Sequence, residues 1–252
     1  MSRWKEELPS YEEPDEGVAN LKRHGIKVGY IDMQNSVYET LVPTKLVVRD
    51  CFVDVDDDLA AGIALDANAN RGQFIALGSS YNTNLDLTVE DCDMQTTRSA
   101  ETVGYTSVID GNGTQIVKVV IRNNTFGTEE NPVDGFAIKF GRRQNGAEIA
   151  IEGNAVYGAT VGSTEYFSIL DLWQSGGNSY DGLTIAMKDN ALFCEADADS
   201  DVYIAEVEAS VNGTGHTLTV SGNTINGEAA GADRVLNSAA EDGGSDLAVV
   251  EE

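Results

Sequence analysis

The stretch VVIRNNTFGT, residues 119–128, runs from alternating apolar residues into two asparagines and then returns to a phenylalanine. A single copy would indicate a strand that ends in a turn, because asparagine accepts the left-handed backbone that turns need. Similar stretches recur along the chain as LTVEDCDM, IAIEGNAV, MKDNAL and LTVSGNTI. Each has an apolar pair, a bend residue, an Asn or Cys, and a hydrophobic residue two places on. The copies indicate a repeat fold.

We define the corner position of each repeat as the residue equivalent to Asn124. Residues five and three places before the corner, and two places after it, are apolar in every repeat, so these rows are expected to point inward. A second strand family shows its own period of 31 residues at Phe74, Tyr105, Phe136 and Phe167, followed more loosely by Val202 and Val235. The corner positions, 30 to 41 residues apart, are Cys51, Cys92, Asn124, Asn154, Asn190 and Asn223.

Two outward rows alternate in charge from repeat to repeat, as expected for parallel strands in register, where equivalent side chains lie ~4.8 Å apart. The row two places before the corner reads Arg49, Glu90, Arg122, Glu152, Lys188 and Ser221. The row six places before it reads Lys45, Asp86, Lys118, Glu148, Thr184 and Thr217. Each exposed pair contributes about 0.2–1 kcal/mol, so the rows serve mainly to fix the register.

The residues before the corners are types that accept left-handed or bend geometry, which lets each coil turn. Behind them, the four corner asparagines are expected to form a side-chain amide ladder that satisfies their buried polar groups. Cys51 and Cys92 replace the amides at one end, where adjacent thiols are expected rather than a disulfide. The bend residues are Asp50, Asp91, Asn123, Gly153, Asp189 and Gly222.

These strand, bend and asparagine repeats resemble the right-handed parallel β-helix family, the pectate-lyase-like solenoids that include polysaccharide-degrading enzymes and viral tailspikes. The resemblance covers about residues 30–237 and implies an all-β fold, a single right-handed parallel β-helix of about six coils with a short N-terminal helical cap. We expect a cap or attachment segment over residues 1–40, with Pro14 opening its helix and Gly25 ending it. The β-helix domain then spans residues 41–237, and residues 238–252 form an acidic flexible tail.

The composition restricts the partners. There are 42 acidic residues against 16 basic ones, a net charge of −26. This excess argues against nucleic acid and against an anionic membrane surface, both of which attract Lys and Arg. It is typical of proteins from halophilic organisms, where salt screens the self-repulsion. The sequence has no apolar run of the roughly 18 residues that a membrane span needs and no signal peptide.

Polar loops are expected between the two strand families, at residues 79–84, 111–115, 142–146, 174–182 and 210–215. Aromatic rings beside polar and cationic side chains are typical of surfaces that bind sugars or proteins. The alternative is that Trp173 closes the core. The predicted binding residues at this loop edge are Trp173, Tyr180, Arg142, Arg143 and Tyr81.

Two acidic turns are candidate metal sites. Asp197, Asp199, Asp201 and Glu208 match four ligand positions of an EF-hand loop, but Val202 stands where the loop needs glycine. No cofactor is predicted; a structural calcium, magnesium or sodium ion at Asp197, Asp199 and Asp201, or at Asp54, Asp56, Asp57 and Asp58, is an alternative to solvated turns.

Catalytic groups are sparse. His216 and His24 have no nucleophile at a recognisable spacing, so a hydrolytic triad has little support. A glycosidase needs two carboxylates roughly 5–9.5 Å apart. Asp110 and Asp171 are expected two coils apart and at different strand positions, which is too far. We therefore expect a protein without enzymatic activity.

Three function classes fit this fold. The first is a virion protein of a virus that infects a halophilic archaeon: a capsid decoration, turret or tail spike assembled in the host cytoplasm. The others are a polysaccharide lyase or glycoside hydrolase and a haloarchaeal cell-surface protein, both of which need an export route. The missing export signal favours the virion if Met1 is the native start. Expected partners are other virion proteins and a surface glycan or receptor.

Self-association is expected through a flat, largely uncharged row between the two charged rows. Small and β-branched residues also simply suit strands, so ordinary solvent-facing sheet is the alternative. A homotrimer is the favoured assembly. The row, which we call the interface strip, consists of Val47, Thr88, Val120, Ala150, Ala186 and Thr219.

Overall fold

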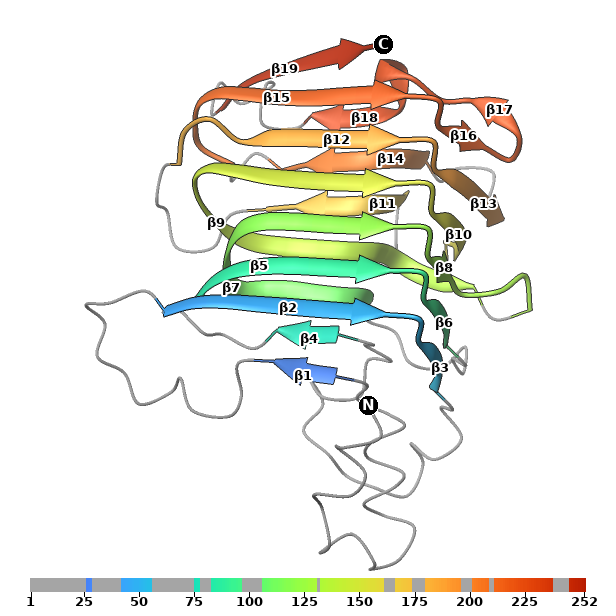
Figure 1. The fold of residues 1–252 in the computed structure, drawn as a ribbon. Helices are drawn as coiled ribbons and strands as arrows, with labels where there is room; N and C mark the ends of the chain where they lie inside the picture. Colours follow the sequence, from blue (N-terminus) through green and yellow to red (C-terminus); the bar gives the residue numbers. More distant parts are fainter. Residues whose placement is uncertain are drawn as a thin grey trace, which may run out of the picture.

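The fold is an all-β parallel solenoid, seen here in a computed structural model (Figure 1). Within the described part of the chain the elements are strands and one 3-10 turn, η3 (Ala232–Arg234). The predicted cap helix, from Pro14 to Gly25, lies outside the residues that the structure describes. The structure describes residues 26–28, 42–55, 75–77, 83–96, 106–130, 132–160, 166–173, 180–195, 201–208, 211–237 and 245–252.

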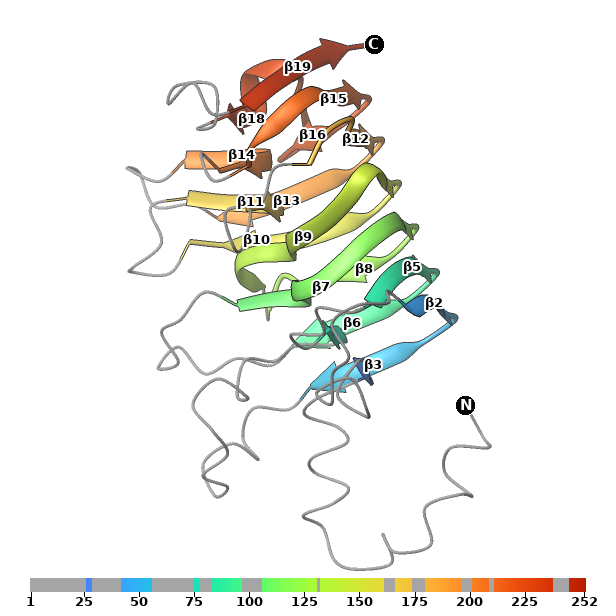
Figure 2. The ribbon, with the colours of Figure 1, turned by 90° about the vertical axis from the view of Figure 1, so that its left-hand side faces the viewer.

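Three stacks of strands make the walls of the solenoid (Figures 1 and 2). The first, which we call the front sheet, faces the viewer in Figure 1, and its neighbours all pair in parallel. It contains β2 (Val42–Arg49), β5 (Thr83–Glu90), the second halves of β7 (Thr106–Arg122) and β9 (Val133–Glu152), β12 (Thr184–Lys188), β15 (Gly213–Ser221) and β19 (Ser245–Glu251).

The other two stacks are the back sheet and the side sheet. The back sheet contains β1 (Ile26–Val28), β4 (Ile75–Leu77), the first halves of β7 and β9, β11 (Tyr166–Leu172), β14 (Asp201–Val207) and β18 (Val235–Asn237). The side sheet follows the corners and contains β3 (Phe52–Val55), β6 (Asp93–Thr96), β8 (Thr125–Phe126), β10 (Ala155–Ala159), β13 (Ala191–Glu195) and β16 (Thr224–Ile225), with β17 (Glu228–Ala229) antiparallel to β16.

The front-sheet register is the one predicted from the corner positions. Each row pairs with itself in the next coil; for example, Arg122 lies opposite both Glu90 and Glu152. Arg49 and Arg122 both form ion pairs with Glu90, at 3.1 and 2.5 Å. Lys45 pairs with Asp86 at 3.7 Å in the other charged row. The charge alternation therefore marks true neighbours.

The corners have the predicted left-handed backbone. Asp50, Asp91, Asn123 and Asp189 have φ between 51° and 55°. Gly153 has φ of 63°, and a Cβ there would lie 2.9 Å from the Oδ1 of Asn123 in the preceding coil. Glycine at this corner therefore removes both backbone strain and a steric clash.

Behind the corners, the predicted asparagine ladder is present. Nδ2 of Asn154 donates to Oδ1 of Asn190 at 2.9 Å, and Nδ2 of Asn190 donates to Oδ1 of Asn223 at 2.9 Å. At the other end, the backbone N–H of Cys92 donates to Oδ1 of Asn124 at 3.0 Å. Cys51 and Cys92 are buried and are not joined by a disulfide, as predicted.

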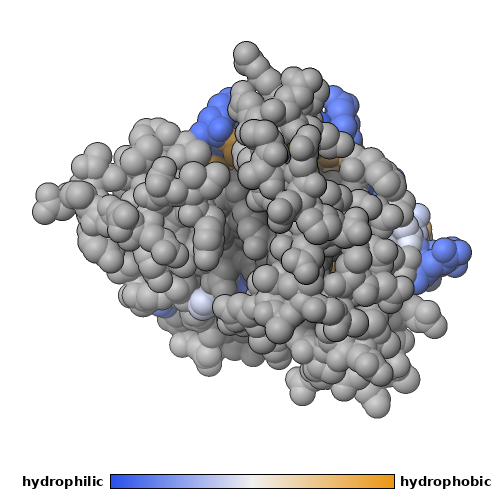
Figure 3. All heavy atoms as spheres, turned by 90° about the horizontal axis from the view of Figure 1, so that it is seen from below, coloured by the Kyte–Doolittle hydropathy of each residue, from blue (hydrophilic) through white to orange (hydrophobic). Residues whose placement is uncertain are grey.

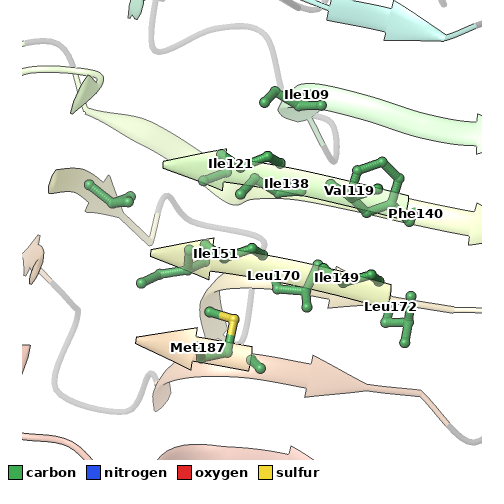
Figure 4. Close-up of a cluster of buried hydrophobic side chains, with 14 of the residues drawn as sticks. Ile109, Val119, Ile121, Ile138, Phe140, Ile149, Ile151, Leu170, Leu172 and Met187 are labelled. Carbon is green, nitrogen blue, oxygen red and sulfur yellow. The ribbon is translucent and has the colours of Figure 1, made fainter. Parts of the chain in front are cut away.

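The inward rows of the three sheets fill one continuous apolar core. Val119, Ile149 and Ile151 of the front sheet face Ile138 and Leu170 of the back sheet (Figure 4). Around the end of the stack that is seen from below, the described residues at the rim are mostly hydrophilic (Figure 3).

Two sequence predictions for the back sheet are wrong. Phe136 lies opposite Ser107 and Ser168, not opposite Tyr105 and Phe167, so the period of 31 residues does not give the register. Residues 111–115 and 142–146 are not loops but lie within the long strands β7 and β9. There the parallel pairing of β7 and β9 is interrupted by two irregularities, between Gly111 and Gln115 and between Ile116 and Lys118, and resumes on the other side of the bend.

The predicted flexible tail also differs from the structure in its last residues. Ser245–Glu251 form β19, which pairs in parallel with β15 and adds a rung to the front sheet. Leu247 and Val249 continue the inward rows, opposite His216 and Leu218. Alternating apolar residues outweigh the acidic and Gly-rich composition that suggested a tail.

Candidate functional site

A row of charged residues crosses the outer face of the back sheet. Lys139 on β9 lies opposite Asp171 on β11, which lies opposite Glu206 on β14. Their strand neighbours Ile138 and Leu170 point into the core (Figure 4). Because successive side chains of a strand point to opposite faces, the charged residues point outward.

These outward side chains are nevertheless buried. Asp171 is 0% exposed and Glu206 is 5% exposed. Lys139 Nζ forms an ion pair with Oδ2 of Asp171, and lies 4.0 Å from Oε1 of Glu208. We call the set Lys139, Tyr166, Asp171, Glu206 and Glu208 the carboxylate–lysine cluster.

Aromatic rings border this cluster. The Nζ of Lys139 lies 4.8 Å from the ring centroid of Phe136 and 5.6 Å from that of Trp173. Both distances are within the range in which a cation is attracted to a ring face. The two rings and the ion pair with Asp171 together fix the position of Lys139. In this position its ammonium group also lies within 4.0 Å of Glu208.

The environment changes the protonation of the cluster. Burial raises the pKa of Glu206 to about 7, with a hydrogen bond from Tyr166 acting in the opposite direction and the charge of Asp171 adding to the rise. Burial and Asp171 also raise the pKa of Glu208. Burial, followed by Glu206, raises the pKa of the Tyr166 hydroxyl. The cluster therefore takes up or releases a proton near neutral pH.

Asp171 and Glu206 combine two features of an acid–base pair. They stand on adjacent strands, whose spacing is about 4.8 Å, and their environments differ: Asp171 pairs with Lys139, whereas burial raises the pKa of Glu206. Oε2 of Glu206 is buried and has no hydrogen-bond partner in the part of the chain that the structure describes. The burial of both carboxylates restricts access for a large substrate.

This cluster was not predicted from the sequence, because Asp110 and Asp171 were expected at different strand positions. In the structure Asp110 and Asp171 have the same position, each opposite Lys139. Aligning the apolar residues Ile138 and Leu170, which are paired, would have revealed the row.

The predicted loop-edge residues are partly described. Trp173 is half-buried directly after β11, and its backbone N–H donates to the Phe140 carbonyl at 3.1 Å. Arg142 and Arg143 lie on β9 opposite Gln115 and Ile116. Tyr180 is half-buried and its N–H donates to the Asn212 carbonyl at 3.4 Å. Trp173 thus lies beside β9 at Phe140, two residues before Arg142, whereas Tyr81 and residues 174–179 lie outside the described residues.

The interface strip has the predicted register from Val47 to Thr219. Val250 on β19 lies opposite Thr219 and extends it. Val47 and Val250, at its two ends, are 39% and 41% exposed.

The predicted cation sites are mostly outside the described residues, which include Asp201 and Asp54 but not Asp197, Asp199 or Asp56–Asp58. Asp201 is exposed and accepts a hydrogen bond from the Tyr203 hydroxyl at 3.2 Å. Over the described ranges, no group of three or more His, Cys, Asp or Glu side chains could hold a metal ion.

His216 lies in the core rather than in a catalytic site. It is 1% exposed, and its Nδ1 accepts a hydrogen bond from the backbone N–H of Leu183 at 3.3 Å. His24 lies outside the described residues.

No family model, curated protein or solved structure matches this chain. In the described residues, no helix has the length and apolar character to cross a membrane.

Proposed function

We propose that this chain is a non-enzymatic structural or adhesion protein of a virus particle that infects a halophilic archaeon, serving as a capsid decoration, turret or tail spike. The observation that carries the proposal is the charge balance of the front sheet. Its two charged rows hold five cations and four anions, a net charge of +1 (5 − 4), in a chain whose net charge is −26.

A surface that contacts only salt solution does not need nearly equal numbers of positive and negative side chains. Five of the 16 cationic side chains of the protein are spent on one face, where they neutralise the acidic residues beside a flat strip of small side chains. A neutral, flat face loses less hydration energy on contact with another protein than an acidic one. This supports a role in assembly.

The described carboxylates support a non-enzymatic role as well. Glu90 is held by Arg49 and Arg122, and Asp86 pairs with Lys45. Asp171 and Glu206 are buried. A polysaccharide chain needs accessible carboxylates in an open groove, whereas these four are paired with cations or buried.

Mass spectrometry of purified virus particles tests the proposal. The chain should be present in a fixed ratio to the major capsid protein and should stay with particles through density-gradient purification. Absence from intact particles would overturn it. Recovery in the cell envelope of uninfected cells would instead support a haloarchaeal cell-surface protein.

Attachment is proposed for the loop edge, at Trp173, Tyr180, Arg142 and Arg143. The triple variant Trp173→Ala, Tyr180→Ala, Arg142→Ala should keep its melting temperature and lose binding to host cells or to particles. The melting temperature of Trp173→Ala alone shows how much stability is lost with the ring beside Lys139, which separates that effect from a loss of binding. A triple variant that binds normally would exclude this edge, and one that does not fold would show a structural role.

A polysaccharide lyase or glycoside hydrolase is the second candidate, favoured by one observation: Asp171, which is paired with Lys139, lies opposite Glu206, whose pKa burial raises to about 7. Purified protein, assayed in high salt against acidic and neutral polysaccharides, should then release reducing ends or unsaturated products. Asp171→Asn and Glu206→Gln should each abolish the release. No product from any polysaccharide would remove this candidate.

A further inference from the structure

We propose that the front sheet binds a second copy of this chain face to face, with the two solenoid axes antiparallel. The inference concerns the chain alone and holds whether or not it belongs to a virus particle. It rests on the order of charges in the two rows that flank the interface strip.

The first step is the geometry of the face. The rows two and six places before the corner lie at equal distances on either side of the strip, which is four places before it. Arg122, Val120 and Lys118 show this arrangement on β7, and Glu152, Ala150 and Glu148 show it on β9. A single coil therefore carries the same sign on both sides of the strip, and the next coil carries the opposite sign.

This pattern excludes one of the two ways to place a second copy on the sheet by two-fold symmetry. If the axis runs along the solenoid, each coil meets the same coil of the partner, and one charged row meets the other. Arg122 would then lie opposite the partner's Lys118, and Glu152 opposite the partner's Glu148. The charged side chains of every coil would then face side chains of the same charge on the partner, which is strongly unfavourable in an interface.

The other arrangement is complementary. An axis parallel to the strands reverses the order of the coils and places each row opposite itself. If the axis passes between Val120 and Ala150, Arg122 lies opposite the partner's Glu152, and Lys118 opposite the partner's Glu148. By symmetry each pair occurs twice, and the two middle coils of the face are matched in both rows.

The strip fits the centre of such an interface. In the antiparallel arrangement Val120 meets the partner's Ala150, and Thr88 meets the partner's Ala186. These side chains are small, so the sheets can approach to the roughly 10 Å that is usual for packed sheets. The longer charged side chains then form a rim around an apolar centre.

The size of the face sets the strength of the complex. Six overlapping strands cover about 29 Å along the solenoid, and with a width of about 20 Å this gives roughly 600 Å² per copy. The total, roughly 1,200 Å², is at the lower end of specific protein interfaces. We therefore expect a reversible dimer whose population depends on concentration.

Light scattering over a wide range of concentration, in high salt, gives the first readout. The mass should rise from 26.9 kDa to twice that value. Val120→Asp with Ala150→Asp places like charges together at the axis and should hold the chain at the monomer mass. The matched control is Ala155→Asp with Ala191→Asp on the side sheet, where the same chemistry faces outward on paired strands and should leave the dimer intact.

Crosslinking with a short bifunctional maleimide reports the orientation. Thr88→Cys mixed with size-tagged Ala186→Cys should give a mixed dimer, whereas Thr88→Cys alone should give none. The three native cysteines are buried, and the wild-type chain measures their background. Crosslinking of Thr88→Cys to itself would overturn the antiparallel arrangement. A monomer at every concentration, or the threefold mass of the trimer expected from the sequence, would overturn the dimer.

Discussion

The side chains of Asn124 and Asn154 are joined by a hydrogen bond across one coil, in which Nδ2 of Asn124 donates to Oδ1 of Asn154 over 3.0 Å. The same oxygen accepts the backbone N–H of Asn124 at 3.0 Å, and Nδ2 of Asn154 donates to the Ile121 carbonyl at 3.0 Å. One amide therefore satisfies three buried groups of the coil below. The ladder fixes the corner as well as the spacing of the coils.

Replacing Asn154 tests this ladder. Asn154→Ala leaves the Asn124 N–H and the Ile121 carbonyl buried without partners, at about 1–3 kcal/mol each, so unfolding free energy should fall by about 2–6 kcal/mol. Denaturant unfolding measures the loss. Thr217→Ala, on an outward row nearby, should change stability by less than about 0.5 kcal/mol. Equal losses for the two variants would contradict a special role of the ladder.

Lys139 is expected to stabilise the fold by compensating Asp171. Lys139→Met keeps the length of the side chain but removes its charge, and the buried carboxylate should cost about 3–5 kcal/mol of stability. Adding Asp171→Asn should restore most of it, because the uncompensated charge is then gone. A double-mutant cycle gives the coupling. Additive losses would show that the two residues act independently.

Glu206 should make stability depend on pH. Its pKa in the folded chain, about 7, is above the ordinary value of 4.5, so folding favours the protonated carboxyl. The contribution is complete below pH 4.5 and is lost as pH rises through about 7. Its size is on the order of 3 kcal/mol.

Comparing wild-type protein with Glu206→Gln between pH 4 and 8 isolates this contribution. The wild type should lose stability relative to the variant as pH rises, since glutamine does not ionise. Glu148→Gln, on the exposed front sheet, should give a profile parallel to that of the wild type. A Glu206→Gln profile that is also parallel would mean that Glu206 ionises normally.

The three cysteines should be unreactive in the folded protein. Burial raises the pKa of Cys92 to about 11 and that of Cys194 to about 12, and only the thiolate reacts. At pH 8 a chromogenic thiol reagent should therefore react slowly with the native chain. After denaturation it should react with three thiols per chain. Fast native reaction would indicate an exposed thiol, and fewer than three thiols after denaturation would indicate a disulfide.

The front sheet was predictable because its strands enter a corner at a fixed distance. In each coil the apolar residues five and three places before the corner, such as Leu46 and Val48, lie at a fixed distance from an Asn or Cys. The hydrogen bonds of the asparagine ladder and the left-handed bends keep this distance the same in every coil. The sequence therefore contains the register of this wall explicitly.

The back sheet was not predictable in the same way, since its strands do not lie at a fixed number of residues from a corner residue. Phe167 pairs with Val202, 35 places on, whereas Phe136 pairs with Ser168, 32 places on. Spacing between aromatic residues could not resolve such differences. The carboxylate–lysine cluster depends on this register, which explains why Lys139 and Glu206 were missed.

Glu251 interrupts an inward-facing row of the front sheet on its last described strand. It lies on β19 opposite Val220, in the row that holds an apolar residue in each earlier coil, and its Oε2 accepts the backbone N–H of Ala232 at 3.2 Å. Another coil laid on this rung would enclose an ionised group in the core. Glu251 therefore opposes the stacking of a further coil on β19. Anyone lengthening the protein by duplicating a repeat at this end would have to begin by replacing Glu251 with a hydrophobic residue.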